Sequence, residues 1–283
     1  MQTNELITDY PKQVSIETAT TCNAHCDFCP HHELARVGHV MEMGLVEKII
    51  RELAEFPQSH PLEIATNGVN EPLADKRTLD ILSLISGSLP WAKIYFVTNG
   101  NLLTEKAVAE LARHNLSKLN ISLNFCERET YERRVGLRWD KTTAALDMLH
   151  EKVQAAEFPY PVHVSRVEDG SEQDASFARF VRSRYPAFQC WLKSSGDWLG
   201  AVSNVSHKPR GAKGKCGQWY MLHIASTGIV QYCCMDGDCQ FPRGYAKTMN
   251  LLDIYNQPDW LDLRHGDTTR FDVYPCNRCT YML

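Results

Sequence analysis

The chain has 283 residues, 43% of them hydrophobic and 10% aromatic, enough for one large domain or two small ones with a real core. Its net charge of −4 excludes, for the whole chain, the strongly basic character typical of nucleic-acid and anionic-membrane partners. Because no apolar run reaches about eighteen residues and no secretion signal is present, we expect a cytoplasmic protein. Eleven cysteines in such a chain favour metal binding or catalysis over disulfides.

From residue 13 onward, apolar segments of strand length alternate with longer segments of helical period. The predicted strands are Gln13–Thr18, Leu62–Thr66, Ala92–Thr98, Lys118–Phe125, Pro161–Val167 and Phe188–Lys193. The predicted helices are Gly44–Phe56, Lys76–Ser86, Thr104–His114, Lys141–Gln154 and Glu172–Arg184. Six such units predict an α/β fold, a partial (β/α)6 barrel over residues 1–195, with its active site at the C-terminal ends of the strands.

A second module is predicted after the sixth strand. Residues 196–215 are rich in Gly, Lys and Pro, which is typical of a linker or loop. Residues 216–283 hold six of the eleven cysteines, and their pattern predicts a small α+β module. Its expected elements are a hairpin (Trp219–Ala225 with Ile229–Tyr232) and short helices at Leu251–Tyr255 and Trp260–Arg264. Because this module has few hydrophobic residues, we expect a metal site to stabilise it.

Three cysteines, Cys22, Cys26 and Cys29, follow the first predicted strand with the spacing C-x3-C-x2-C. Three thiolates do not complete a tetrahedral metal site. A 4Fe–4S cluster held by three cysteines instead keeps one iron open for a cosubstrate. The alternative is a structural zinc site completed by a neighbouring histidine, His25, His31 or His32. The position on the first βα loop of a barrel favours the cluster.

This spacing, with the aromatic Phe28 before the third cysteine, resembles the defining motif of the radical S-adenosylmethionine (SAM) superfamily. The resemblance covers almost the whole chain. In that family SAM chelates the open iron, and one electron from the cluster cleaves SAM to a 5′-deoxyadenosyl radical. The resemblance therefore implies a SAM-binding 4Fe–4S cluster on the three cysteines, SAM as cosubstrate, and an electron donor such as flavodoxin or ferredoxin.

Further residues match the family's SAM contacts in the expected order. Asn70, Glu71 and Pro72 stand where the family carries the end of a Gly-Gly-Glu-Pro motif, which receives the SAM amino group; Asn70 replaces the second glycine. The strand-end residues that the resemblance implies as contacts of the SAM ribose or carboxylate are Thr98, Ser122 and Asn124. For the arginine that pairs with the SAM carboxylate, Arg166 is favoured over Arg133 and Arg134, which also suit a solvated helix face.

Four later cysteines have the layout of a second metal site: Cys216, Cys233 at a glycine-x4-cysteine spacing, and Cys276 with Cys279 in a terminal C-x2-C. Four thiolates suit either a closed iron–sulfur cluster or a zinc knuckle. Next to the first triplet, this layout resembles the twitch domain, a half-length form of the SPASM domain, which implies one auxiliary 4Fe–4S cluster. Because four residues follow Cys279, we expect no second auxiliary cluster.

Either Cys233 or Cys234 can be the ligand of the auxiliary cluster. Only one of them is expected to be, because adjacent residues of an extended segment point to opposite sides. The glycine spacing favours Cys233. Cys234 is then a free thiol beside the cluster, and Cys126, after the fourth strand, is its rival as a reactive thiol. Cys190 and Cys239 suit buried small hydrophobic positions.

Among twitch-containing enzymes, the chain resembles neomycin C epimerase and the butirosin-pathway dehydrogenase of 2-deoxy-scyllo-inosamine. The resemblance implies hydrogen abstraction from a carbohydrate-like substrate, an aminoglycoside or aminosugar of antibiotic biosynthesis. The spare thiol favours epimerisation, with Cys234 as the catalytic hydrogen-atom donor. Dehydrogenation through the auxiliary cluster is one alternative, and a non-enzymatic iron–sulfur or zinc module is another. Peptide maturation is a third, but such enzymes commonly carry an N-terminal recognition domain, for which about a dozen residues before the first strand give no room.

We therefore expect a small polar substrate, with a cationic one compatible, and no nucleic-acid or membrane partner. Carboxylates suit the ammonium groups of an aminosugar. The candidate substrate contacts are Lys193, Asp197, Trp198, Asp236 and Asp238.

Overall fold

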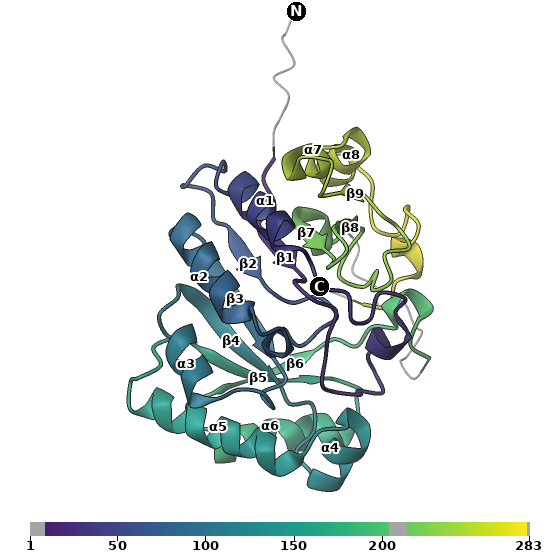
Figure 1. Ribbon diagram of the computed structural model, residues 1–283. Coiled ribbons are helices and arrows are strands. Elements are labelled where there is room, and N and C mark those ends of the chain that lie inside the picture. The colour runs from purple at the N-terminus through teal and green to yellow at the C-terminus, as the bar shows by residue number, and fades with distance from the viewer. Residues whose placement is uncertain (1–8, 204–213, 282–283) are drawn as a thin grey trace, which may run out of the picture.

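The computed structural model describes residues 9–203 and 214–281, and its core is one nine-stranded sheet (Figure 1). The strands lie in the order β6-β5-β4-β3-β2-β1-β7-β8-β9. The first six are β1 Gln13–Ile16, β2 Glu63–Ala65, β3 Lys93–Thr98, β4 Leu116–Ser122, β5 Val162–Val167 and β6 Gln189–Lys193. Each pairs in parallel with the next. The six predicted strands and their parallel arrangement as a partial barrel are confirmed.

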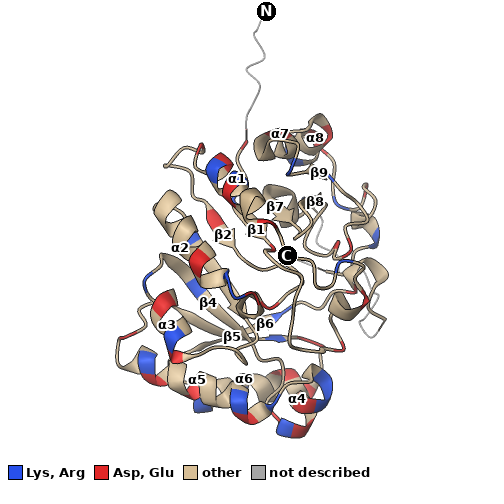
Figure 2. Cartoon of the chain, viewed as in Figure 1, with Lys and Arg blue, Asp and Glu red and all other residues tan. Residues whose placement is uncertain are grey.

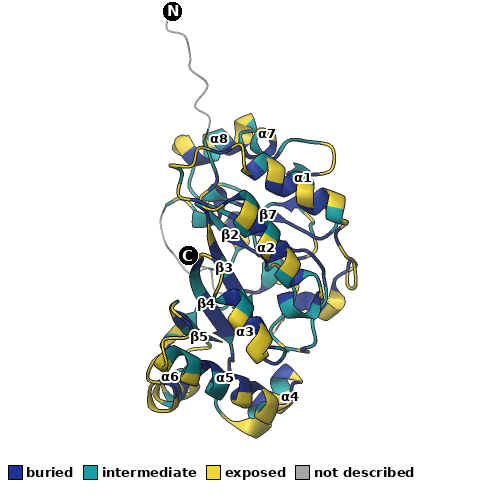
Figure 3. Cartoon of the chain, turned by 60° about the vertical axis from the view of Figure 1, so that its left-hand side comes forward, coloured by how far each residue is buried: buried dark blue, intermediate teal, exposed yellow. Residues whose placement is uncertain are grey.

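Helices cover the outer face of this parallel sheet (Figure 1). They are α1 Met43–Leu53, α2 Thr78–Ser88, α3 Glu105–Leu111, α4 Arg128–Val135, α5 Trp139–Gln154 and α6 Glu172–Arg184. Thr104 caps α3 as its side chain accepts a hydrogen bond from the Ala107 amide at 3.2 Å. Buried faces point to the sheet and exposed faces to the outside (Figure 3). Among the described helices, none has both the length and the apolar composition needed to cross a membrane.

Side-chain alternation gives each parallel strand a helix-packed face and an inner face. On β4, Leu119 and Ile121 are fully buried in the core that the helices cover. The alternate residue Lys118 is paired in register with Tyr95 of β3, and Ser165 of β5 is paired with Trp191 of β6. The inner face of β3 to β6 thus carries aromatic and polar side chains.

The C-terminal module continues the same sheet. Its strands are β7 Met221–Ile224, β8 Ile229–Gln231 and β9 Gly244–Tyr245, and its helices are α7 Leu251–Tyr255 and α8 Pro258–His265. β7 pairs in parallel with β1, whereas β8 and β9 are antiparallel. The expectation of a separate module was thus incomplete: the open edge of β1 needs hydrogen-bond partners, and β7 provides them. Of the predicted linker, residues 204–213 lie outside the described residues.

Candidate functional site

The first cysteine loop lies between β1 and α1, with Cys22, Cys26 and Cys29 all half-buried. Burial raises the pKa of Cys22 to about 11, and the nearby charges of Glu71 and Cys29 add to this shift. Burial also raises the pKa of Cys26, again with contributions from the other two thiols. The three thiols therefore lie within electrostatic range of one another, as ligands of a shared group must.

Helix α4 holds this loop in place through a backbone hydrogen bond and an ion pair. The His25 amide donates to the Val135 carbonyl at 2.7 Å, and the Arg134 side chain pairs with Asp27 at 2.7 Å. The Arg134 guanidinium also lies over the Phe125 ring at 4.7 Å. Arg133 is exposed on the outer face of the same helix. These contacts give Arg134 a role in holding the cysteine loop against the barrel.

The two expected metal groups require different spacings of the thiols. Thiolates that share one zinc ion at 2.3 Å stand only about 3.8 Å apart. Nowhere in residues 9–203 or 214–281 do three His, Cys, Asp or Glu side chains converge closely enough to hold a single metal ion. An iron–sulfur cluster gives each thiolate its own iron and so accepts a wider spacing.

Glu71 joins the ends of β2 and β3. The Thr98 hydroxyl donates to Glu71 Oε1 at 2.7 Å, and the Asn99 amide donates to Oε2 at 2.6 Å. The Leu73 amide adds a third hydrogen bond at 3.1 Å. Burial raises the pKa of Glu71 to about 7 against these three donors. Glu71 and Thr98 are therefore partners of each other, and their direct contact with SAM stays a prediction.

Four buried polar atoms beside the cysteine loop have no hydrogen-bond partner: Thr21 Oγ1, Thr66 Oγ1, Asn67 Oδ1 and Asn70 Nδ2. Asn70 Oδ1 accepts from the Gly68 amide at 2.8 Å, so only its Nδ2 donor is left over. Buried polar groups almost always find partners, so these atoms indicate a polar ligand. The amino and carboxylate groups of SAM match this need, and the residues present fit the cofactor.

Three further predicted SAM contacts make contacts within the protein: Ser122, Asn124 and Phe28. Asn124 Oδ1 accepts from the Val167 amide at 3.0 Å, and Asn124 Nδ2 lies 3.3 Å from Ser122 Oγ. These bonds join the ends of β4 and β5. The Phe28 ring packs 6.3 Å from that of Phe125. Their predicted contacts with SAM remain predictions.

Arg166 does not face the site. It shares the helix-packed side of β5 with the buried Val162 and Val164. Its guanidinium donates at 2.7 Å each to Asp174, Asp169 and the Asn124 carbonyl. All three nitrogens are engaged in contacts within the protein, and the predicted pairing of Arg166 with the SAM carboxylate stays a prediction.

The four predicted auxiliary ligands line one cavity of the C-terminal module, whose described lining does not include Cys234. The cysteines there are Cys216, Cys233, Cys276 and Cys279. Among the described residues that line the cavity, Arg270 alone carries a permanent charge. Arg270 donates to the carbonyls of Cys279 at 2.9 Å and Tyr281 at 3.1 Å, while its buried Nε has no partner. Cluster sulfides accept such hydrogen bonds, so this cavity fits an iron–sulfur group.

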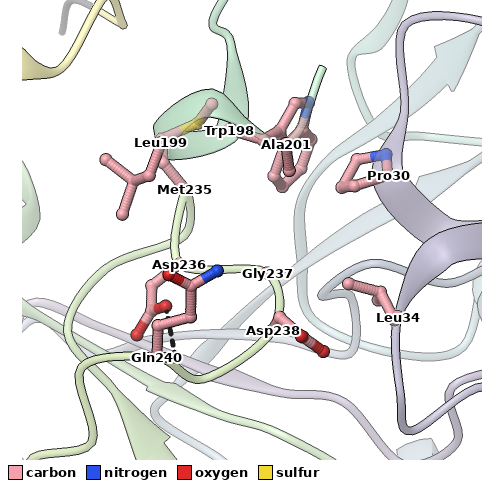
Figure 4. A pocket seen from close by; sticks show the side chains of 10 residues that line it. All are labelled: Pro30, Leu34, Trp198, Leu199, Ala201, Met235, Asp236, Gly237, Asp238 and Gln240. Atoms are coloured by element: carbon pink, nitrogen blue, oxygen red, sulfur yellow. Dashed lines mark hydrogen bonds between the residues drawn. The ribbon is translucent and has the colours of Figure 1, made fainter.

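A second cavity lies between the first cysteine loop and the loop 235–240 (Figure 4). Asp236 lines it, but the Asp236 carboxylate accepts from the Gln240 amide at 2.7 Å and the Phe241 amide at 3.0 Å. Asp238 accepts from the Ala35 amide at 3.1 Å, and Trp198 Nε1 donates to the Phe28 carbonyl at 3.2 Å. These predicted substrate contacts therefore organise loops.

The other two predicted substrate contacts lie elsewhere. The Asp197 amide donates to Thr280 Oγ1 at 2.9 Å, in the contact between the loop after β6 and the C-terminal segment. Lys193 is on the inner face of the barrel, in register with Val167 of β5. Trp198, Asp236 and Asp238 thus line one cavity, whereas Asp197 and Lys193 are not among its described lining residues.

A buried ion pair that sequence reasoning missed connects the two cysteine regions. Arg36 Nη1 pairs with Glu17, and Arg36 Nη2 donates to the Gly237 carbonyl at 2.6 Å. Glu17 Oε2 accepts from the Val69 amide at 2.7 Å, next to the Asn70 segment. The signal available was a glutamate at the C-terminal end of the first predicted strand, directly before the cysteine loop.

Two family profiles match the chain in this arrangement: that of the radical SAM superfamily over residues 16–157, and an iron–sulfur cluster-binding SPASM domain over residues 216–280. The chain belongs to the radical SAM superfamily. It uses SAM and two iron–sulfur clusters, and SAM supplies the radical when bound.

Among curated proteins, the chain is similar to the FeMo cofactor biosynthesis protein NifB of Azotobacter vinelandii, with 33% identity over 42% of this chain and 25% of that protein. It is also similar to a probable GTP 3′,8-cyclase of Methanosarcina mazei, with 32% identity over 46% of this chain and 39% of that protein. The chain therefore spans well under half the length of these relatives.

Among solved structures, BtrN in complex with AdoMet and 2-DOIA matches 96% of this chain and 94% of its own, with a TM-score of 0.69. Streptococcus suis SuiB bound to its precursor peptide SuiA matches 96% of this chain and 70% of its own, with a TM-score of 0.71. Both are 16% identical to this chain, so the likeness concerns the fold.

Proposed function

We propose that this chain is a cytoplasmic epimerase that acts on a small polar, carbohydrate-like substrate. Bound SAM would supply the radical that removes a hydrogen atom from one substrate carbon, and the Cys234 thiol would return a hydrogen atom to the opposite face of that carbon. The observation that carries this proposal is the division of the cysteine pair. Cys233 lines the four-cysteine cavity, whereas the half-buried Cys234 is not among the described lining residues but lies within electrostatic range of Cys216 and Cys279.

The surroundings of Cys234 support a position near the substrate. Tyr281 lies within electrostatic range of both Cys234 and Tyr95, and Tyr95 is on the inner face of β3. Gly196, in the loop after β6, packs so closely on this segment that a Cβ there would lie 3.0 Å from the Tyr281 Cβ. The C-terminal segment at Tyr281 therefore lies close both to Cys234 and to the inner face of the barrel.

The hydrogen balance of the step is simple. The S–H bond of Cys234 breaks and a C–H bond forms on the substrate, which leaves a thiyl radical. One electron from a reductant and one proton from solvent restore the thiol. An external reductant, such as a flavodoxin or ferredoxin, would supply the electron, and Cys216, Cys233, Cys276 and Cys279 would hold the cluster beside Cys234.

The test is turnover of a candidate sugar in deuterium oxide, with Cys234→Ala against wild type. Because thiol protons exchange with water, wild type should place one deuterium at the inverted carbon. Cys234→Ala should still form 5′-deoxyadenosine yet release no epimerised product. Cys190→Ala, on the outer side of β6, is the matched control and should behave as wild type.

Two results would contradict the proposal. A ketone formed equally by wild type and Cys234→Ala would establish dehydrogenation through the auxiliary cluster. Deuterium delivery that survives in Cys234→Ala but is lost in Cys126→Ala would move the donor role to the thiol that follows β4.

A further inference from the structure

Two lysines on the inner face of the barrel share one aromatic ring. Lys193, at the end of β6, holds its Nζ 5.0 Å from the centroid of the Trp191 ring. Lys118, on β4, holds its Nζ 5.7 Å from the same ring and 4.6 Å from the Tyr95 ring. Aromatic faces attract cations, so Trp191 and Tyr95 keep both ammonium groups inside the barrel instead of in bulk water.

A histidine completes the group. The His163 ring, on β5, stands edge-on to Trp191 with centroids 5.9 Å apart at an interplanar angle of 84°. His163 Nδ1 is buried and has no hydrogen-bond partner. We call Lys118, Lys193 and His163 the inner-face cation cluster. Its members come from three neighbouring strands, β4, β5 and β6.

No ion pair among the described residues includes either lysine of this cluster. The acidic residue on the same face, Glu63 of β2, accepts instead from Gln13 Nε2 and Ser117 Oγ, both at 2.5 Å. By contrast, lysines and arginines on the outer helices lie among acidic residues (Figure 2). On the inner face, the two lysines therefore carry positive charge in cation–π contacts, without an ion pair to a described residue.

Holding this charge has an energetic cost. Burial, with the charge of Lys118 adding to it, lowers the pKa of Lys193 to about 8. Burial and the two lysines also lower the pKa of His163. A bound anion would offset this cost, since buried charges are normally paired. Trp191 is 37% exposed on the edge strand of the sheet, so a ligand has access to the cluster.

We propose that the inner-face cation cluster binds an oxyanion, a carboxylate or a phosphate, carried by the substrate. Lysine ammonium groups bind either oxyanion through charge-assisted hydrogen bonds. This inference rests on the proposed function only in that the inner face is where the substrate lies. It differs from the expectation of a cationic aminosugar. Of the carboxylates expected to bind one, Asp236 and Asp238 accept hydrogen bonds from loop amides, and Asp197 lies in the loop after β6.

The experiment measures lysine accessibility in the SAM-free holoenzyme under anaerobic conditions. Lysines are reductively methylated with formaldehyde and a borane, and each site is quantified by peptide mass spectrometry. The probes are inorganic phosphate and acetate, each compared with sodium chloride at the same ionic strength. With a probe at about ten times its dissociation constant, methylation of Lys193 and Lys118 should slow roughly tenfold. Lys106, exposed on α3, is the internal control and should keep its rate.

A variant pair then tests the cluster itself. Lys193→Gln should raise the dissociation constant of the protecting probe, measured through Lys118, by roughly tenfold or more. Lys106→Gln should leave it unchanged. Iron content and circular dichroism confirm that both variants are folded and loaded.

The comparison of phosphate with acetate identifies the source of the oxyanion. Protection by phosphate alone supports a phosphorylated substrate, protection by acetate alone supports a sugar acid, and protection by both supports the shared oxyanion site. Protection by neither probe, or equal protection of Lys106, overturns the proposal. Cys234 and product formation do not enter this assay, so a failed epimerase test and a failed oxyanion test are distinguishable.

Discussion

The two cysteine regions use the same ligand type but are surrounded by different chemistry. Three thiols of the first loop lie beside unpartnered hydroxyl and amide atoms at the ends of β1 and β2. Four thiols of the C-terminal module line a cavity together with aromatic and apolar side chains and Arg270. The number of thiols and the residues around them therefore suit the first site to a polar cosubstrate and the C-terminal site to a closed cluster.

The charges beside the two sites have opposite sign. Glu71 is buried close enough to Cys22 to raise the pKa of that thiol. Arg270 acts in the opposite direction on Cys216 and Cys279. A carboxylate favours a cationic cosubstrate such as SAM, whereas a guanidinium favours the more negative, reduced form of a cluster.

The largest expected effect tests whether the two cysteine regions hold separate clusters, and it comes from removing each cysteine set in turn. Wild type purified without oxygen should hold about eight irons, four per cluster. Replacement of Cys22, Cys26 and Cys29 by Ala should remove about half of the iron and all SAM cleavage. Cys276→Ala with Cys279→Ala should also remove about half of the iron but leave SAM cleavage measurable.

Iron analysis and 5′-deoxyadenosine formation measure these outcomes. Stoichiometric zinc without iron after anaerobic reconstitution would contradict both cluster assignments. Loss of SAM cleavage in both variants would show that the two sites do not work separately.

The sequence predicted the six parallel strands of the barrel because each strand depends on local pattern, and the two cysteine sets are visible in the same way. Apolar strands and thiol spacings are visible along the chain, and the structure places the four predicted auxiliary cysteines around one cavity. The pairing of β7 with β1 was not predictable, since it joins segments about two hundred residues apart. The Arg36–Glu17 pair was not predictable either, because its contacts join distant segments. The contacts of Arg166 with Asp174 depend on which face of β5 the side chain occupies.

Asn70 tests whether the unpartnered atoms of the first site hold SAM. Asn70→Asp keeps the Oδ1 acceptor that binds the Gly68 amide and removes the Nδ2 donor. Losing a hydrogen bond to a charged group costs about 1.5–3 kcal/mol, so SAM should bind roughly tenfold to hundredfold more weakly with both clusters intact. Equilibrium binding of SAM is the measurement.

Asn115→Asp is the control for this change, because Asn115 Nδ2 donates to the Ala92 carbonyl at 3.0 Å near the opposite ends of the strands. It should leave SAM affinity unchanged. Equal affinities for wild type and Asn70→Asp would mean that the unpartnered Nδ2 serves another ligand.

Arg270 tests the charge at the other site, through the reduction potential of the auxiliary cluster. Reduction adds negative charge, and a buried guanidinium stabilises that charge. One unit charge about 7 Å away at an effective dielectric constant of about 20 is worth about 2.4 kcal/mol, or on the order of 100 mV. Arg270→Gln should therefore make the potential more negative by up to this amount, and Arg270→Lys should recover most of the shift.

The measurement is a redox titration followed by electron paramagnetic resonance, in the variant that lacks the three first-loop cysteines so that one cluster contributes the signal. Arg278→Gln is the matched control: this arginine is next to Cys279 in sequence but is exposed. Because solvent and salt screen an exposed charge, its removal should shift the potential much less. Equal shifts in Arg270→Gln and Arg278→Gln would show that the buried guanidinium has no special influence, and the difference in charge between the two cysteine regions would then have no redox consequence.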